Sequence, residues 1–247
     1  NYGRVRAFMV EAYGLPSNLG WSVDIEGDRA AVGARGAAYV YEKSGNGQWN
    51  LVSTLLASDG FAGDDFGHAV SLSGDTIVVG AVAETLPVGP GAAYVFERSQ
   101  AGQWSQIAKL QAGGGPFRQG HSVSILGDRI VVGAPGDAGK VLVYTRSLDG
   151  SWMQEATLSN SDPAGGDRLG VSVDQSGDRI VAGAVGKGAA YVFRRNVDGT
   201  WPQEYKLLPS DPNPGSFGYG VSISGDRALV SAATWNGARG KGYIFSR

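Results

Sequence analysis

A Gly-Asp pair that follows an alternating apolar stretch recurs five times, and this repetition restricts the possible folds more than any other feature. The successive spacings are 47, 53, 50 and 48 residues. The five pairs are Gly27-Asp28, Gly74-Asp75, Gly127-Asp128, Gly177-Asp178 and Gly225-Asp226. A fixed period of this length indicates a repeat architecture, in which each unit is one supersecondary element.

Each repeat contains four segments with the pattern of short strands. An alternating stretch such as "FGHAVSLS" precedes the Gly-Asp pair, which we expect to form a two-residue hairpin loop with glycine at the position of positive φ. An apolar run such as "RIVVGA" follows, then an aromatic and β-branched run such as "AAYVF". The fourth segment begins with tryptophan, as in "WSQIAKL", and no stretch has a convincing helical period.

Four-stranded units at this period predict an all-β fold, a single five-bladed β-propeller over residues 1–247. The last repeat ends after its third strand, while an unassigned strand-like segment, "RVRAFMVEA", precedes the first repeat. We therefore expect the N-terminal strand to complete the last blade and close the ring. The expected boundaries are 19–58, 66–112, 120–160, 169–209 and 217–247 for the five blades, with 1–13 as the outer strand of the fifth.

Charge and composition argue against several classes of partner. The formal net charge is −2 and no basic block occurs, so neither a nucleic-acid footprint nor a polybasic membrane patch is predicted. No apolar run reaches the ~20 residues of a transmembrane helix, and the first residues lack a signal-peptide pattern. The chain has no cysteine, so it has neither disulfides nor thiolate metal sites.

The phrases "GDDFGHAVSLSGDTIVVGA" and "GAAYVFER" resemble the FG-GAP repeat, found in integrin α-subunit propellers and in many bacterial extracellular proteins. The bacterial variant with the Gly-Asp turn is the more similar. The resemblance implies a secreted, cell-surface or periplasmic protein that acts in adhesion, ligand binding or carbohydrate binding. The Asp-x-Asp-x-Asp-Gly calcium loop of integrin-type repeats is absent, so we predict neither a metal site nor a cofactor.

The residue after the first-strand glycine differs between repeats, although the repeat around it is well kept. This position is Trp21, His68, His121, Val171 and Tyr219 in the five repeats. Because the first strand of a blade lines the central channel, these side chains should ring one end of that channel. We expect the two histidines to fill the channel with hydrogen bonds to backbone; a metal-binding or acid–base role is the alternative.

Two other groups are candidates for ligand binding. Trp21 and Trp235 fall outside the register of the repeated tryptophans, and exposed loop aromatics suit sugar stacking or protein contacts; local packing is the alternative. The repeated tryptophans themselves, Trp49, Trp104, Trp152 and Trp201, should be architectural. The acidic loop "SDGFAGDDFG", with Asp64 and Asp65, could accept hydrogen bonds from sugar hydroxyls or bind a cation, or simply stabilise its turns.

The sequence thus favours a non-catalytic extracellular binding or adhesion module that recognises a carbohydrate or a protein. The alternatives are an accessory subunit of a larger surface assembly and, third, a hydrolase or lyase that uses His68, His121 and loop acids. No catalytic residue is predicted, because neither a pair of positioned carboxylates nor a Ser-His-Asp arrangement is evident.

Overall fold

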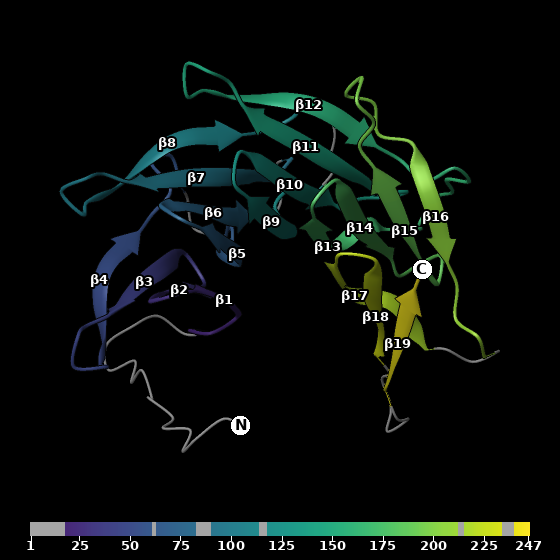
Figure 1. Ribbon diagram of the computed structural model, residues 1–247, viewed down its shortest axis with the longest axis horizontal. Coiled ribbons are helices and arrows are strands. Elements are labelled where there is room, and N and C mark those ends of the chain that lie inside the picture. Colours follow the sequence, from purple (N-terminus) through teal and green to yellow (C-terminus); the bar gives the residue numbers. More distant parts are fainter. Residues whose placement is uncertain (1–17, 61–62, 83–89, 114–117, 212–214, 234–239) are drawn as a thin grey trace.

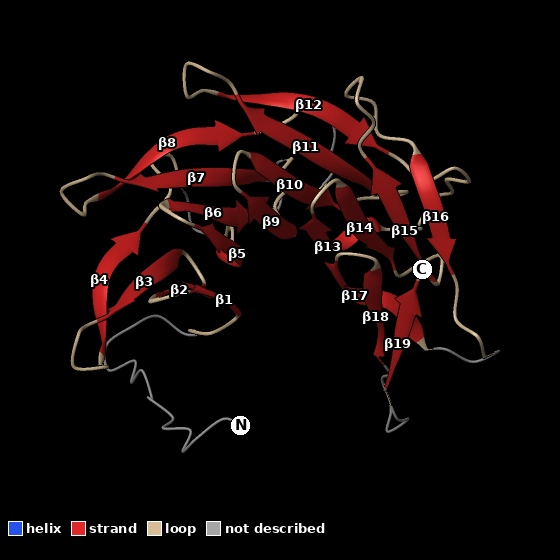
Figure 2. Cartoon of the chain, viewed as in Figure 1, coloured by secondary structure: helices blue, strands red, loops and turns tan. Residues whose placement is uncertain are grey.

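The protein is built from five antiparallel sheets that follow one another around an arc (Figure 1). The computed structural model describes residues 18–247 except 61–62, 83–89, 114–117, 212–214 and 234–239. Within these ranges every strand or helix assigned is a β-strand (Figure 2). The sheets have four, four, four, four and three strands, which confirms the predicted all-β, five-bladed propeller architecture.

Each sheet is formed by consecutive strands. The first contains β1 (Ser22–Glu26), β2 (Arg29–Ala34), β3 (Ala37–Lys43) and β4 (Trp49–Leu55). The second contains β5 (Phe66–Ser73), β6 (Thr76–Ala81), β7 (Ala92–Arg98) and β8 (Trp104–Leu110). The third contains β9 (Ser122–Leu126), β10 (Arg129–Ala134), β11 (Lys140–Arg146) and β12 (Trp152–Leu158). The fourth contains β13 (Leu169–Ser176), β14 (Arg179–Ala184), β15 (Ala189–Arg194) and β16 (Gln203–Leu207). The fifth contains β17 (Ser216–Ser224), β18 (Arg227–Ala233) and β19 (Lys241–Ser246).

The first strand of every sheet lies on the inner side of the arc. Figure 1 shows β1, β5, β9, β13 and β17 lining this side, while β4, β8, β12 and β16 lie outside. The Gly-Asp pairs form the tight hairpins between the first two strands, as predicted: Glu26 pairs with Arg29, and Gly27 has a φ of 58°.

In the second, third and fourth blades the second and third strands carry the core, because these sheets are covered on both faces. Val78 of β6 and Val131 of β10 are fully buried, as expected for the middle layer between neighbouring blades. The apolar clusters cross blade boundaries: one joins Val40 of β3 to Ile77 of β6. The core is therefore shared between neighbouring blades.

A pair of glycines brings adjacent blades into backbone contact. In four blades, a Cβ atom on the glycine of the second strand would stand 2.0–2.1 Å from a carbonyl oxygen of the next blade. The pairs are Gly33 with Gly67, Gly80 with Gly120, Gly133 with Gly170, and Gly183 with Gly218. This close approach explains why the repeat keeps both glycines.

The predicted ring closure by residues 1–13 lies outside the described residues. In the part of the chain that is described, no strand pairing joins the first sheet to the fifth, and Figure 1 shows these two sheets at the ends of the arc. None of the described segments is a helix long and apolar enough to cross a membrane.

Candidate functional site

In the second, fourth and fifth blades the residue after the first-strand glycine sits at an irregularity of the strand pairing, which takes its side chain out of the regular ladder. In the second blade, Phe66 pairs with Ala81 and Ala69 with Gly80, so Gly67 and His68 form the irregular step. The pairing of β17 with β18 is interrupted in the same way around Tyr219. Bulges are frequent at sites where a side chain must be re-aimed.

Three of these five side chains form a continuous aromatic row across the first three blades. The ring centroids of Trp21 and His68 are 5.8 Å apart, and those of His68 and His121 are 4.9 Å apart. Both pairs are tilted, at 49° and 53°. Trp21 stands at the end of the row with 63% of its surface exposed, so one end of the row is open to a ligand.

His121 is the anchored member of the row. Its Nδ1 lies 3.0 Å from the carbonyl oxygen of Val171, so Nδ1 carries the proton and Nε2 is left as an acceptor. Burial, with a smaller repulsion from His68, lowers the pKa of His121 to about 4. The ring is therefore neutral at neutral pH, as expected for a side chain that fills the channel with a hydrogen bond to backbone.

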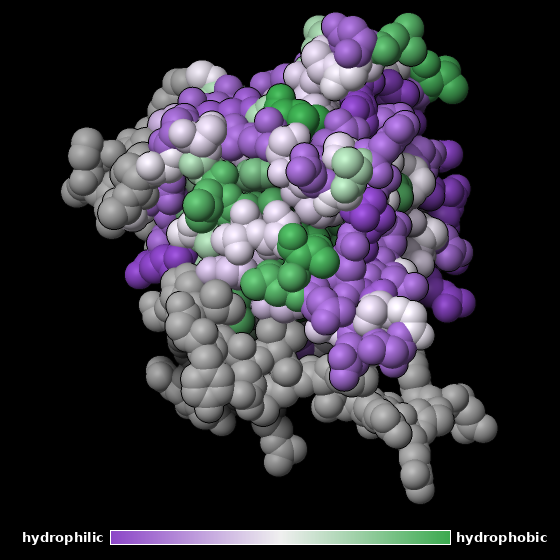
Figure 3. All heavy atoms as spheres, turned by 90° about the vertical axis from the view of Figure 1, so that its left-hand side faces the viewer, coloured by the Kyte–Doolittle hydropathy of each residue, from purple (hydrophilic) through white to green (hydrophobic). Residues whose placement is uncertain are grey.

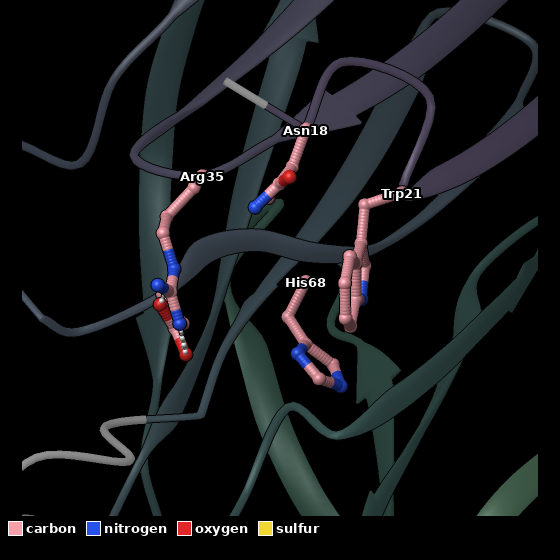
Figure 4. Close-up of a pocket in the computed structure, with 6 residues that line it drawn as sticks. Asn18, Trp21, Arg35 and His68 are labelled. Atoms are coloured by element: carbon pink, nitrogen blue, oxygen red, sulfur yellow. Dashed lines mark hydrogen bonds and ion pairs between the residues drawn. The ribbon is translucent and has the colours of Figure 1, made fainter. Parts of the chain in front are cut away.

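A pocket of about 220 Å³ lies beside Trp21 and His68 (Figure 4). The Trp21 and His68 side chains run side by side, and the Asn18 amide points between His68 and Arg35. Arg35 forms the opposite wall through a two-pronged ion pair with Asp65, with Nε–Oδ1 at 2.7 Å and Nη2–Oδ2 at 3.2 Å. The pocket therefore combines an aromatic wall with a polar wall.

Both predicted acidic residues of the second-blade loop are buried. Asp64 accepts a hydrogen bond from the Phe66 backbone amide at 3.1 Å, and Asp65 holds Arg35 while its own backbone has a φ of 50°. Only the Asp65 carboxylate reaches the pocket wall, already paired with a cation. These contacts are those of turn-stabilising residues.

Other aspartates in the loops between blades hold neighbouring blades together. Asp59 accepts hydrogen bonds from the Tyr94 hydroxyl at 3.0 Å and from Lys109 at 2.6 Å. Equivalent contacts join Asp162 to Tyr191 and Lys206, and Asp211 to Tyr243 and Lys241. We call each such Asp–Tyr–Lys set a latch. The hydrogen bond from Lys109 lowers the pKa of Asp59, which keeps the latch charged.

The remaining predicted residues are not gathered at this pocket. Val171 is buried; Tyr219 is half exposed, and among the described rings none contacts it. Trp235 lies outside the described residues. Among the described residues, no group of three or more His, Asp or Glu side chains is arranged to hold a metal ion.

Comparison with known families agrees with the geometry of the blades. The FG-GAP repeat model matches residues 49–96, 152–193 and 201–245, together more than half of the chain. The chain belongs to the FG-GAP repeat family. The FG-GAP propeller fold indicates a binding or structural module.

A solved structure shares the fold of this FG-GAP chain. The crystal structure of a structural-genomics target protein from Lactobacillus plantarum matches with a TM-score of 0.63 at 17% identity. The match covers 91% of this chain and 66% of that protein, so this chain spans only about two thirds of its length. No curated protein matches the sequence.

Sequence reasoning missed Asn18 and Arg35, although one of them leaves a signal in the FG-GAP repeats. Arg35 follows Ala34 at the hairpin between the second and third strands. In the other repeats, valine, proline or threonine stands at that position: Val82, Pro135, Val185 and Thr234. A charged residue at one copy of a position that is uncharged in the other repeats marks a local departure from the repeat. Asn18 precedes the repeat and leaves no comparable signal.

Proposed function

We propose that this FG-GAP propeller is a non-catalytic module that binds carbohydrate at the pocket between Trp21, His68 and the Arg35–Asp65 ion pair. The observation that most supports this proposal is the exposed indole of Trp21 at the end of the aromatic row, which lies opposite the polar wall formed by Arg35 and Asp65. Ligand pockets typically combine apolar or aromatic walls with a few placed polar groups.

The chemistry of the two walls suits a sugar ring. The apolar C–H face of a pyranose can lie against the exposed indole of Trp21, since aromatic rings offer a large rigid apolar surface. On the other wall, Arg35 donates to hydroxyl oxygens, and the Asn18 amide both donates and accepts. Because the Asp65 carboxylate already fixes the guanidinium, little side-chain entropy is lost on binding.

The surroundings of the proposed site favour binding over catalysis. The Nδ1 of His121 bonds the Val171 carbonyl, and its lowered pKa of about 4 makes the remaining nitrogen a weak base, while the Asp65 carboxylate is paired with Arg35. A general acid–base pair would need a proton donor and an acceptor poised at the working pH. An extracellular or cell-surface location is part of this proposal, because FG-GAP repeats typically occur in such proteins.

A glycan array followed by calorimetry on the retained glycans tests the proposal. Trp21→Ala and Arg35→Ala should each weaken binding at least tenfold, while Tyr219→Ala, the matched change in the fifth blade, should leave it unchanged. Thermal unfolding must show that the variants remain folded. Retention of no glycan at high protein concentration, or equal binding by the Trp21→Ala protein, would remove the carbohydrate assignment.

A structural role as an accessory subunit is the second candidate, because the first blade carries apolar residues on its outer strand. Leu51 stands on β4 where the other complete blades have glutamine, and Val52 beside it is also exposed. The space-filling view of this side shows apolar atoms among hydrophilic ones (Figure 3). Light scattering tests this role by comparing the parent chain with its Leu51→Gln/Val52→Glu variant. The comparison is made for the purified chain and for the native complex. Unchanged assembly in both would exclude this strand as the contact.

A further inference from the structure

Four of the five blades begin at a tight turn that starts with a left-handed residue other than glycine. These residues are Asn18, Asp65, Arg118 and Arg168, with φ values of 71°, 50°, 54° and 59°. Each stands three positions before the residue that follows the first-strand glycine. In three of the turns that later residue donates its amide to the carbonyl of the left-handed residue, as Val171 does to Arg168 at 3.3 Å. The turn thus brings its two variable residues to the same end of the inner strand.

The four left-handed residues differ in how easily they adopt this backbone conformation. Asparagine and aspartate enter the left-handed region several times more readily than other non-glycine residues, because their short side chains form local hydrogen bonds. Arginine has no such compensation, so Arg118 and Arg168 hold a strained conformation that glycine or asparagine would relieve. Backbone strain of this kind is concentrated at binding sites, which suggests that the two side chains are kept for what they contact.

The two arginines flank the buried end of the aromatic row. His121 comes three residues after Arg118, and its Nδ1 lies 3.0 Å from the carbonyl oxygen of Val171, in the turn that Arg168 begins. Burial lowers the pKa of His121 to about 4, and repulsion from His68 adds to this effect. The charges of Arg118 and Arg168 act in the same direction, so both guanidinium groups lie close enough to influence the ring.

The carboxylates beside Arg168 do not neutralise its charge. Asp167 is buried, where it accepts hydrogen bonds from Asn160 at 3.1 Å and from the Ala164 amide at 2.8 Å. The backbone carbonyl of Asp137 accepts a hydrogen bond from the Arg168 amide at 3.1 Å, but among the described residues no carboxylate forms an ion pair with the guanidinium. Arg168 is exposed, so its charge faces the solvent.

The charge at the left-handed position changes from one blade to the next. In the second blade this position is Asp65, and Arg35 of the preceding blade balances its charge at 2.7 Å. In the third and fourth blades it is arginine, and the residues that correspond to Arg35 in the preceding blades are uncharged, namely Val82 and Pro135. One end of the aromatic row is therefore balanced in charge, while the other end carries two guanidinium groups.

We propose that the carbohydrate stacked on Trp21 is anionic, and that Arg118 and Arg168 bind its carboxylate or sulfate group. The anion site extends the carbohydrate site along the aromatic row, and so it depends on the proposed function. The His68 ring centroid lies 5.8 Å from that of Trp21 and 4.9 Å from that of His121. A ligand longer than one sugar ring, lying along this row, passes from the indole to the arginines. Arginine suits the role because its planar guanidinium donates two parallel hydrogen bonds to an anionic group.

Calorimetry with a matched set of oligosaccharides tests this proposal. The set has one backbone in three forms, which are neutral, uronate-containing and sulfated. The parent protein should bind at least one acidic form at least tenfold more tightly than the neutral form, and the better of the two identifies the anionic group. This preference should shrink as the NaCl concentration rises from about 50 to about 500 mM, because salt screens exposed charges.

Arginine variants assign the preference to these turns. Arg168→Gln and Arg118→Gln should each lower the affinity for the acidic form at least fivefold, which removes most of its advantage over the neutral form. Arg227→Gln is the matched control, because Arg227 begins β18 beside the hairpin at the opposite end of the inner strand. Thermal unfolding must show that all three variants remain folded.

NMR of the His121 imidazole gives a readout that a merely structural role of the arginines would not produce. Inorganic sulfate, used as the probe, should raise the pKa of His121, because a nearby anion favours the protonated ring. The rise should be smaller in Arg168→Gln than in the Arg227→Gln control. A pKa that is the same with and without sulfate would overturn the anion site.

The binding data separate failure of the anion site from failure of the carbohydrate site. Equal affinity for the neutral and acidic forms would overturn the anion site and leave the carbohydrate site in place. An acidic preference that persists in both arginine variants would overturn the assignment to Arg118 and Arg168. Binding of none of the three forms would overturn the proposed function and the anionic ligand together.

Discussion

The carbonyl oxygen of Gly120 lies 2.0 Å from the point at which a Cβ atom on Gly80 would stand. Since real Cβ atoms do not approach an oxygen so closely, any other residue at position 80 must push two blades apart. The same relationship repeats at three further blade junctions. The glycines of the repeat are therefore required by contacts between blades, and not only by turns.

Gly80→Ala should destabilise the protein by about 3 kcal/mol or more, because the methyl group meets backbone that has no room to move. Gly45→Ala is the matched control, since a Cβ atom there meets nothing within 4 Å and the backbone φ is not positive. Urea unfolding followed by tryptophan fluorescence gives both values. Similar midpoints for the two variants would show that the blades can separate without cost.

Replacing Asp162 should change how stability responds to acid. Hydrogen bonding from Lys206, reinforced by Tyr191, lowers the pKa of Asp162 below its ordinary value. A carboxylate with a lowered folded-state pKa contributes stability above its unfolded pKa of about 3.9, and this contribution is lost as the pH falls. Asp162→Asn should therefore show a smaller drop in melting temperature between pH 5 and 3 than the parent.

Asp128→Asn is the control for that experiment, because Asp128 lies in an exposed hairpin turn. Its acid response should follow that of the parent. If Asp162→Asn and the parent lose the same number of degrees on acidification, the latch between the third and fourth blades does not depend on charge.

The repeat made the architecture predictable, whereas contacts between residues of different repeats could not be predicted from the sequence. Alternating strands, Gly-Asp turns and the tryptophan-led strand each follow from local patterns, and the hairpin at Gly27 forms as expected. The pairing of Asp59 with Tyr94 and Lys109 joins residues up to 50 positions apart. No local sequence pattern predicts such a contact, so the acidic loop that contains Asp59 had the pattern of a ligand-binding loop in the sequence.

The candidate site was predictable in part for the same reason. The variation at the post-glycine position identified Trp21, His68 and His121 because they occupy one register of the repeat, and the structure brings their rings together. Arg35 and Asp65 come from loops of two different blades. Their meeting depends on how the blades pack, which the repeat period alone does not specify.

The pKa of His121 measured in solution should lie well below that of an ordinary histidine. Its folded-state pKa of about 4, against 6.5 when unfolded, means that the unfolded chain binds a proton more readily. This histidine's stabilising contribution is therefore present above pH 6.5 and is lost as the pH falls from 6.5 towards 4. The chain has only two histidines, so NMR of the imidazole protons, assigned with His68→Gln, measures the pKa directly.

His121→Asn should flatten this part of the stability curve, because asparagine has no titrating ring. Its loss of melting temperature between pH 7 and 5 should be smaller than that of the parent, while His68→Gln retains most of the parent's slope. A His121 resonance that titrates near 6.5 would show that the ring is solvated and that the contact with the Val171 carbonyl opens in solution.

The junction between the second and third blades lacks the tyrosine of the latch, and this allows a constructive test. Leu142 stands where Tyr94 and Tyr191 stand in other blades, beside a cavity of about 230 Å³ that Lys140 also lines. Gly114, outside the described residues, occupies the sequence position of Asp59. Lys140 is the counterpart of Lys241, which completes the latch of the fifth blade.

Gly114→Asp with Leu142→Tyr should therefore install a latch, with Lys140 as its cation. Tyrosine alone buries a hydroxyl without its acceptor, and aspartate alone gains only an exposed ion pair, so each single change should be neutral or destabilising. Together they should show a favourable coupling of about 1 kcal/mol in a double-mutant cycle measured by urea unfolding. Simple additivity of the two changes would mean that the latch is a consequence of blade packing and not a cause of it.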